Sequence, residues 1–433
     1  MERYSEYKDS GIYYIPLIPS SWNVLKGKIL FKEEKRPIRQ QDEIVTCFRD
    51  GQVTLRKNRR LEGFTNSLKE IGYQGIRKGD LVIHNMDAFA GAIGVSDSDG
   101  KATPVYAVCT PIREDVNQYY YCFLLRFLAK IGLIQSLAKG IRERSSDFRY
   151  GDFKELLLPV PSRAEQDAIV SYLDAATSKI DKAIVMQQKM IDLLNERKQI
   201  IIQNAVTKGL DENVEMKNSG VEWIGMIPKH WEIKRLKYVM HSYGRIGFRG
   251  YGTDDIVDEG QGAITLSPSN IQDSSMDYSK KTYLSWKKYY ESPEIMIKNG
   301  DVLMVKTGSS YGKCAVVKDL PMECTINPQL VVFKEHKEFS EFLAYSFQTT
   351  FAKCFINTSV IGGTIPTISQ EKINNYIFPF PSKSEQQAIV AYLDKEMQRF
   401  DSAITNCQRQ IALLQERKQI IINEVVTGKV KVS

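Results

Sequence analysis

The stretch Pro159-Val-Pro-Ser-Arg-Ala-Glu-Gln-Asp-Ala-Ile-Val-Ser-Tyr-Leu-Asp174 decides the fold, because it occurs twice. It returns 220 residues later as Pro379-Phe-Pro-Ser-Lys-Ser-Glu-Gln-Gln-Ala-Ile-Val-Ala-Tyr-Leu-Asp394. The same offset holds without a gap through Glu196-Arg-Lys-Gln-Ile-Ile-Ile202 and Glu416-Arg-Lys-Gln-Ile-Ile-Ile422. Self-similarity of this length at one offset indicates an internal duplication.

A second, shorter repeat precedes each of these stretches. Lys8-Asp-Ser-Gly-Ile12 and Ile18-Pro-Ser-Ser-Trp22 recur 209 residues later as Lys217-Asn-Ser-Gly-Val221 and Ile227-Pro-Lys-His-Trp231. We call these the entry segments. The chain is therefore built twice from one plan: an entry segment, a variable region and a long helical segment.

The repeated stretches begin long helices. Ser162-x-x-Glu165 and Ser382-x-x-Glu385 are capping boxes, and both follow prolines that end a preceding strand. An apolar seam then alternates steps of four and three, which is the heptad repeat of a coiled coil. The seam positions are Leu173, Thr177, Ile180, Ile184, Gln187, Ile191, Leu194, Lys198, Ile201 and Ala205, then Leu393, Met397, Phe400, Ile404, Cys407, Ile411, Leu414, Lys418, Ile421 and Val425. Gly209 and Gly428 follow the last turns, where a left-handed residue is favoured.

Each seam needs a matching helix, and the other copy supplies one. Antiparallel packing would relate the two halves by an approximate two-fold axis and place the first entry segment near the end of the second helix. Lys198 and Lys418 occupy equivalent seam positions, where a polar residue fixes the register. Helices of about 40 residues would form a rigid spacer roughly 60 Å long. The alternative is that both helices are ordinary core elements.

The two variable regions, 23–158 and 232–378, share a layout but no residue-by-residue match. Both contain a Gly-Asp turn before a β-branched run, at Gly79-Asp80 and Gly300-Asp301, followed by glycine-rich turns and one helix. We predict an α+β fold: two α+β domains and two long antiparallel coiled-coil helices with internal pseudo-two-fold symmetry. The predicted boundaries are 1–158 (entry segment and first domain), 159–210 (first long helix), 211–378 (entry segment and second domain) and 379–433 (second long helix).

Composition narrows the class of protein. The 433 residues carry 59 Lys and Arg against 52 Asp and Glu, a mild basic excess. No apolar run reaches the roughly 18 residues of a membrane span, and the first residues lack the apolar core of a signal peptide. Seven cysteines without a Cys-x-x-Cys motif favour a reducing compartment. We therefore expect a cytoplasmic protein without a membrane segment.

The basic excess gathers in clusters with polar and aromatic neighbours, which suit contacts to DNA phosphates and base edges. A cluster of charges is also compatible with a simple solvated surface, and that alternative stays open. The candidate DNA-binding residues are Arg56, Lys57, Arg59, Arg60, Arg142, Arg144, Arg245, Arg249, Lys306 and Lys313.

The motifs of several enzyme classes are absent. Gly308-Ser-Ser-Tyr-Gly-Lys313 lacks the spacing of a phosphate-binding loop, no glycine-rich Rossmann turn follows a strand, and the four histidines lack metal-ligand spacing. A nuclease triad of Asp319 with Glu335 and Lys337 is equally a polar strand end. We expect no catalytic residue, no metal and no cofactor in this chain.

The repeated motifs resemble those of the specificity (S) subunits of type I restriction–modification systems. The resemblance rests on Lys-[Asp/Asn]-Ser-Gly-[Ile/Val], Ile-Pro-x-x-Trp, Pro-x-Pro-Ser-x-x-Glu-Gln, Tyr-Leu-Asp and Glu-Arg-Lys-Gln-Ile-Ile-Ile. It implies two target recognition domains that each bind one half of a split, asymmetric site on double-stranded DNA, with the helices as a ruler between them.

The resemblance also implies partners. Two methyltransferase (M) subunits would dock along the helices and carry the S-adenosylmethionine, and two restriction (R) subunits would add chemistry that needs ATP and Mg. The candidate partner-binding residues are Ile169, Tyr172, Ile389 and Tyr392; local burial of the same residues is equally compatible with the pattern. Alternatives are an orphan two-headed DNA-binding protein without an active methyltransferase partner, and an enzyme in its own right, which the missing motifs disfavour.

Overall fold

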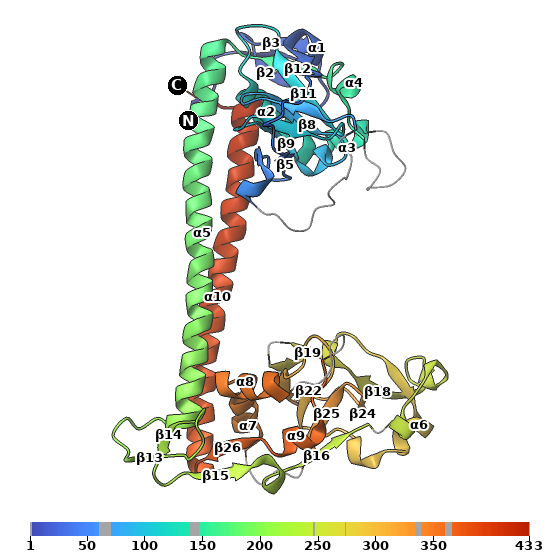
Figure 1. Ribbon diagram of the computed structural model, residues 1–433, viewed down its shortest axis with the longest axis vertical. Coiled ribbons are helices and arrows are strands. Elements are labelled where there is room, and N and C mark those ends of the chain that lie inside the picture. The colour runs from blue at the N-terminus through green and yellow to red at the C-terminus, as the bar shows by residue number, and fades with distance from the viewer. Residues whose placement is uncertain are drawn as a thin grey trace. The chain divides into compact units, whose positions relative to one another are not determined.

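A computed structural model of the chain describes residues 2–59, 71–138, 147–245, 247–272, 274–334, 339–359 and 366–432 (Figure 1). The chain forms two compact units. The first comprises Met1–Gln188 and Gln408–Ser433, and the second comprises Lys189–Cys407. Each unit holds one α+β domain together with part of both long helices, which confirms the predicted fold class.

The first unit is built on a four-stranded antiparallel sheet in the order β4-β11-β8-β9. Short strand pairs β1-β2, β3-β12, β5-β6 and β7-β10 surround it, and helix α2 packs on the sheet. The strands are β1 Tyr7–Asp9, β2 Leu17–Pro19, β3 Asn23–Lys26, β4 Phe31–Glu33, β5 Val45–Cys47, β6 Val53–Leu55, β7 Gln74–Ile76, β8 Leu81–His84, β9 Ile93–Val95, β10 Gly100–Ala102, β11 Tyr106–Pro111 and β12 Leu157–Val160. The short helices are α1 Gly27–Leu30, η1 Arg56–Asn58, η2 Ala88–Ala90, α2 Gln118–Lys130, α3 Leu133–Leu137 and α4 Tyr150–Phe153.

The second unit repeats this sheet in the order β16-β25-β22-β23 and adds a second sheet, β17-β21-β18-β24, in which β18 and β24 are parallel. Its strands are β13 Met216–Asn218, β14 Met226–Pro228, β15 Glu232–Arg235, β16 His241–Gly244, β17 Ile256–Val257, β18 Gly262–Leu266, β19 Ile271–Gln272, β20 Ser275–Met276, β21 Tyr283–Ser285, β22 Val302–Val305, β23 Cys314–Val316, β24 Cys324–Ile326, β25 Leu330–Lys334 and β26 Ile377–Phe380. The helices are η4 Leu236–Tyr238, η5 Gly247–Arg249, η6 Thr253–Asp255, η7 Pro268–Asn270, α6 Trp286–Tyr290, η8 Pro293–Ile295, α7 Ser340–Phe347, α8 Thr350–Ser359 and α9 Gln370–Asn374.

The duplication is visible in strand register. Tyr7 pairs with Pro19 in the first entry hairpin, and Met216 pairs with Pro228 in the second, so both partners are shifted by the same 209 residues. The Gly-Asp turns are also equivalent, because Gly79 and Gly300 both adopt a positive φ, of 92° and 93°. The two variable regions, which have no sequence match, therefore share one sheet topology.

The long helices are α5, Arg163–Lys208, and α10, Lys383–Val426. Both predicted capping boxes form: the Ser162 backbone N–H donates to the Glu165 carboxylate at 3.2 Å, and the Ser382 N–H donates to Glu385 at 3.1 Å. Every predicted seam position is buried or half-buried, as a heptad seam requires.

Within each unit the helix segments run antiparallel. In the first unit, Leu173 and Val425 share a hydrophobic core, and the Lys418 ammonium lies 2.7 Å from Asp181. In the second, the equivalent Lys198 lies 2.6 Å from Asp401. Each seam lysine is thus paired with a carboxylate on the facing helix, as expected for a polar residue that fixes register.

The entry segments dock against the helix ends, as predicted. Gly428 ends α10 with φ of 73°, and a Cβ built on it would lie 2.5 Å from Cδ of Pro19 and 3.0 Å from Cη2 of Trp22. Gly209 ends α5 in the same way, 3.3 Å from Cζ2 of Trp231. The buried indoles donate from Nε1 to the capping-box carboxylates of Glu165 and Glu385, at 3.2 and 3.3 Å. Each unit therefore joins an entry segment, the start of one long helix and the end of the other.

Candidate nucleic-acid interface

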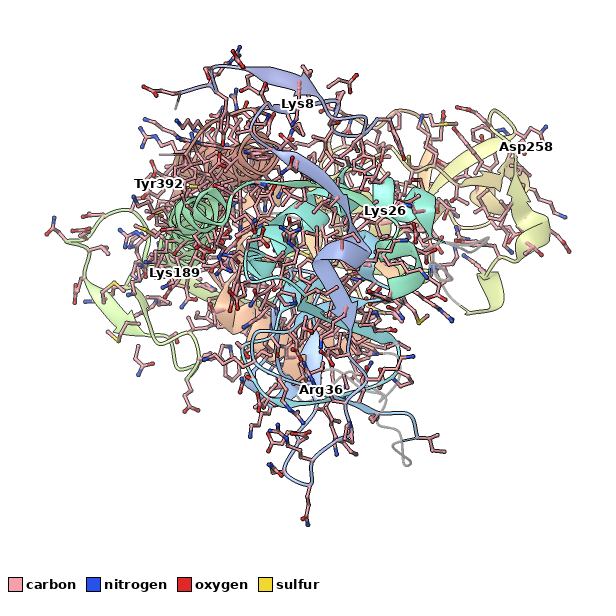
Figure 2. The ribbon with its side chains drawn as sticks, turned by 90° about the horizontal axis from the view of Figure 1, so that it is seen from above. Lys8, Lys26, Arg36, Lys189, Asp258 and Tyr392 are labelled. Carbon is pink, nitrogen blue, oxygen red and sulfur yellow. The ribbon has the colours of Figure 1, made fainter. Side chains whose placement is uncertain are left out.

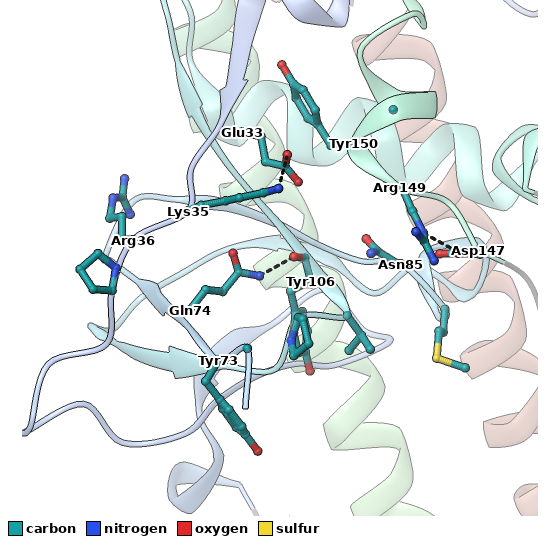
Figure 3. A pocket seen from close by; sticks show the side chains of 16 residues that line it. Glu33, Lys35, Arg36, Tyr73, Gln74, Asn85, Tyr106, Asp147, Arg149 and Tyr150 are labelled. Carbon is teal, nitrogen blue, oxygen red and sulfur yellow. Dashed lines mark hydrogen bonds and ion pairs between the residues drawn. The ribbon is translucent and has the colours of Figure 1, made fainter. Parts of the chain in front are cut away.

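The first unit contains a groove of about 1180 Å³ (Figure 3). It lies beside β11 and β8 and is lined by five separate stretches of the chain. Three cations, Lys35, Arg36 and Arg149, line it with two carboxylates, Glu33 and Asp147. Its other lining side chains include Tyr73, Gln74, Asn85, Tyr106 and Tyr150. Cations, aromatic rings and amides in one concavity suit contact with a nucleic acid.

The cations of this groove are held by carboxylates. Arg36 donates to Asp80 of the Gly-Asp turn with an Nη2–Oδ1 distance of 3.1 Å, and this interaction raises the pKa of the Arg36 guanidinium. Asp80 itself is buried and also accepts the Arg77 backbone N–H at 2.7 Å. Arg149 donates to Asp147 at 2.6 Å at the groove rim. Arg36 is therefore fixed by a buried partner, whereas Arg149 is held only by a surface ion pair.

A second groove of about 890 Å³ adjoins the first, because Val105 and Tyr106 line both. It is lined by the predicted residues Arg56 and Arg59, and by Arg49. Arg59 donates to Asp50 at 2.7 Å and covers the Phe48 ring, with 4.2 Å from Cζ to the ring centroid.

Several of these cations pair with carboxylates that are exposed or half-buried at the surface. Arg49 pairs with Asp87 at 2.8 Å, and the predicted Lys57 pairs with Glu43. An exposed ion pair contributes about 0–1 kcal/mol, so a DNA phosphate can replace the carboxylate at small cost. The first unit thus presents cations that an anionic strand can recruit.

Three predicted residues of this cluster, Arg60, Arg142 and Arg144, lie outside the described residues. Sequence reasoning missed Lys35, Arg36 and Arg49 as groove residues (Arg36 is labelled in Figure 2). Lys35 and Arg36 end the charged run Lys32–Arg36, in which two glutamates offset most of the basic charge, and Arg49 stands outside the dense basic clusters. A search for basic clusters therefore passes over all three.

The structure contradicts a DNA-contacting role for Arg245. This side chain is 4% exposed, and burial lowers the pKa of its guanidinium. It donates to the carbonyl oxygen of Ile326 at 3.0 Å, to Thr325 at 3.0 Å and to the Arg249 carbonyl at 3.2 Å. Arg245 therefore ties β24 to the segment after β16 from inside the domain.

The other predicted residues of the second unit are accessible to different degrees. Arg249 is half-buried and pairs with Glu294 at 3.0 Å. Lys313 is exposed on the turn before β23. Lys306 is half-buried at the end of β22, and desolvation lowers the pKa of its ammonium group. Lys306 and Lys313 flank the Gly308–Gly312 turn.

Two of the four predicted partner-binding residues are wrong for that role. Ile169 and Ile389 are only 1% and 2% exposed, because each packs into the core of the adjacent α+β domain. Tyr172 is half-buried, and Tyr392 is 39% exposed on the surface of α10 (Figure 2).

The helices also expose apolar side chains that the sequence analysis did not single out. Leu193 and Leu413 are 59% and 48% exposed, and Ile200 and Ile420 are 43% and 47% exposed. Each pair is separated by the repeat offset of 220 residues, so the duplicated helices present the same apolar positions twice. Exposed apolar residues that recur in this way indicate a partner surface.

The described part of the chain contains neither a candidate metal site nor a candidate membrane helix. No group of three or more His, Cys, Asp or Glu side chains there could hold a metal ion. Among the same residues, no helix combines the length and the apolar character needed to cross a bilayer.

Comparison with known proteins shows what the chain is similar to. Residues 228–415 match the family model of the type I restriction modification DNA specificity domain. The chain is 24% identical over 326 residues to the MjaVIII specificity subunit of Methanocaldococcus jannaschii, covering 74% of this chain and 71% of that protein. It is 19% identical over 288 residues to the EcoBI specificity subunit of Escherichia coli, covering 64% and 59%.

Solved structures share the fold. One is a chain from a study of complex assembly and conformational transition of the type I R-M system, with 17% identity, a TM-score of 0.74 and coverage of 95% and 99%. Another is the HsdS subunit from Thermoanaerobacter tengcongensis, with 17% identity, a TM-score of 0.53 and coverage of 95% and 98%. The duplicated α+β fold with two long helices is that of a restriction–modification specificity subunit. Residues 228–415 match the specificity domain, and the chain as a whole is similar to type I specificity subunits, in agreement with the resemblance of its repeated motifs.

Proposed function

We propose that this chain gives a type I restriction–modification complex its DNA sequence specificity. Each α+β domain binds one half of a bipartite, asymmetric site on double-stranded DNA. The long helices set the distance between the half-sites and bind the other subunits. The observation that carries the proposal is the duplication itself: one sheet scaffold is built twice, with different side chains at its surface in each copy.

The charges of the first domain support DNA binding. The two adjoining grooves contain Arg36, which is paired with the buried Asp80, and further cations that are paired with carboxylates at the surface. Because surface ion pairs are weak, binding of phosphates costs little and gives a strong dependence of affinity on salt. In the second domain, Lys306, Lys313 and Arg249 are the remaining candidates, and Arg245 is left out because it is buried.

The duplicated apolar positions on the helices support a role as a scaffold. Two modification subunits would cover these positions with equivalent surfaces. One would cover Leu193 and Ile200, the other would cover Leu413 and Ile420, and Tyr172 and Tyr392 would belong to the same contacts. S-adenosylmethionine would be bound by those subunits, and ATP and Mg by two restriction subunits. The chain itself would recognise the DNA sequence and hold the other subunits together in the cytoplasm, without catalysing a reaction.

The proposal is tested by sequencing adenine methylation in the source genome with this gene intact, deleted and restored. We expect methylation at one split motif to disappear on deletion and to return on restoration. A control strain carries a stop codon in the gene of the modification subunit and should lose the same motif. Methylation that persists at every motif after deletion contradicts the proposal and favours an orphan DNA-binding protein.

A further inference from the structure

One of the positions that share backbone geometry but differ in side chain between the two domains carries a polar group in both. It is the residue that directly follows the central strand of each four-stranded sheet: Asn85 after β8 and Lys306 after β22. Both strands begin after the equivalent Gly-Asp turns, and both pair with the neighbouring long strand in the same register.

The backbone hydrogen bonds at this position are also equivalent. The Asn85 N–H donates to the Val105 carbonyl at 2.9 Å, and the Lys306 N–H donates to the Gln329 carbonyl at 2.8 Å. Each residue then accepts a backbone N–H at its own carbonyl oxygen, from Phe148 at 3.0 Å and from Ile368 at 2.9 Å. The position is therefore clamped between two other segments in both domains.

In the first domain, the side chain at this position has a hydrogen-bond acceptor without a donor. Asn85 lines the basic groove and projects its amide into it (Figure 3). Its Oδ1 is buried, and it has no hydrogen-bond partner in the part of the chain that the structure describes. A buried polar atom without a partner costs free energy, so its retention calls for an explanation such as a ligand that completes it.

Lys306, at the equivalent position of the second domain, also has a polar group without a partner. Its Nζ lies over Gly244, where an added Cβ would be only 3.2 Å away, and burial lowers the pKa of the ammonium. Within the described residues no hydrogen bond or ion pair reaches this Nζ. A partly desolvated cation without a counter-charge gains most from an acceptor that arrives from outside the chain.

We propose that Asn85 and Lys306 are equivalent base-reading residues, one for each half-site. This assignment rests on the proposed function and deepens it. An asparagine amide pairs in a bidentate manner with N6 and N7 of adenine, and a lysine ammonium donates to O6 and N7 of guanine. Asn85 therefore reads an adenine in one half-site, and Lys306 reads a guanine in the other.

The test uses the complex of the full chain with its modification subunits, and selects bound duplexes from a library in which both half-sites are randomised. The variants are Asn85→Ala, Asn85→Lys, Lys306→Ala and Lys306→Asn. Asn213→Lys and Lys217→Asn make the same exchanges at exposed positions and serve as matched controls. Thermal unfolding of each variant shows whether it folds. If Asn85→Lys or Lys306→Asn does not fold, the alanine variant at the same position provides the test.

We expect each variant to relax or change the preference at one base pair, by about fivefold to a hundredfold. The Asn85 variants should act in one half-site and the Lys306 variants in the other, while the controls keep both. Wild-type preferences at every position in folded Asn85→Ala and Lys306→Ala overturn the inference, as does a uniform loss of binding over all sequences. A wild-type complex that selects no sequence overturns the proposed function as well.

Discussion

Replacing Gly428 by alanine tests the docking of the entry segment on the end of α10. The residue has φ of 73°, which costs an alanine about 1–2 kcal/mol. The new Cβ would also lie 2.5 Å from Pro19 and 3.0 Å from Trp22. Both neighbours are buried rings of the entry segment, so relieving the overlap adds about 1–3 kcal/mol. We expect a total loss of about 2–5 kcal/mol in the stability of the first unit.

Gly11→Ala is the matched control for this variant. Gly11 has φ of 70° in the same unit, but nothing lies within 4 Å of its added Cβ. The entropy that alanine removes from the unfolded chain is the same at both sites and cancels in the comparison. The difference between the two variants therefore isolates the packing of Gly428 against the entry segment.

The assay is thermal unfolding of the full chain, with hydrogen exchange of the β1–β2 hairpin as the local readout. For a unit of about 200 residues, each kcal/mol lowers the unfolding temperature by roughly 2–4 °C. We expect Gly428→Ala to melt several degrees below Gly11→Ala and to expose the hairpin to exchange. Equal melting temperatures and equal protection of the hairpin in the two variants would refute the close packing of helix end and entry segment.

Three further predictions concern the helices and the second domain. Replacing Leu193 and Leu413 together by serine should weaken binding to the modification subunit by about 1 kcal/mol per site, measured by titration, without lowering the unfolding temperature. The pKa of Lys306 is lower in the folded chain than in the unfolded chain, so the unfolded chain binds more protons at pH values between the folded pKa and 10.5. The free energy of unfolding should therefore rise with pH in this interval, and Lys306→Met should remove the rise, as measured by denaturant titrations. Deleting one heptad from each helix, residues 187–193 and 407–413, should shorten the spacer of the methylated motif by about three base pairs, because seven helical residues span about 10 Å. An unchanged spacer in the methylome would contradict the proposal that the helices set the distance between the half-sites.

The helices were predictable from the sequence because their determinants are local. The capping box at Ser162, the seam and the glycine after each helix lie on one continuous segment, and the structure confirms all of them. The errors concern the direction in which a side chain faces. Ile169 lies on a helix surface that the adjacent domain covers, and a heptad pattern does not say which surface that is.

The candidate site was predictable only in part because it is assembled from distant segments. Arg36 reaches Asp80 across 44 residues, and the mixed charged run Lys32–Arg36 does not single it out from its neighbours. Arg245 stands among glycines and aromatic residues in the sequence, a neighbourhood compatible with both a loop and a buried position. The equivalence of Asn85 and Lys306 appears only when strand register and backbone hydrogen bonds are compared, since the residues around them do not match.

The most direct test of the central claim, that each domain reads one half-site, is a chain in which residues 232–378 also replace residues 23–158. The exchange joins equivalent points, because β3 with β12 and β15 with β26 pair in the same register. Adenine methylation is then sequenced in a host that carries this chain and its modification subunit. The account predicts a symmetric motif, an inverted repeat of one original half-site. A motif that keeps both original half-sites would contradict it.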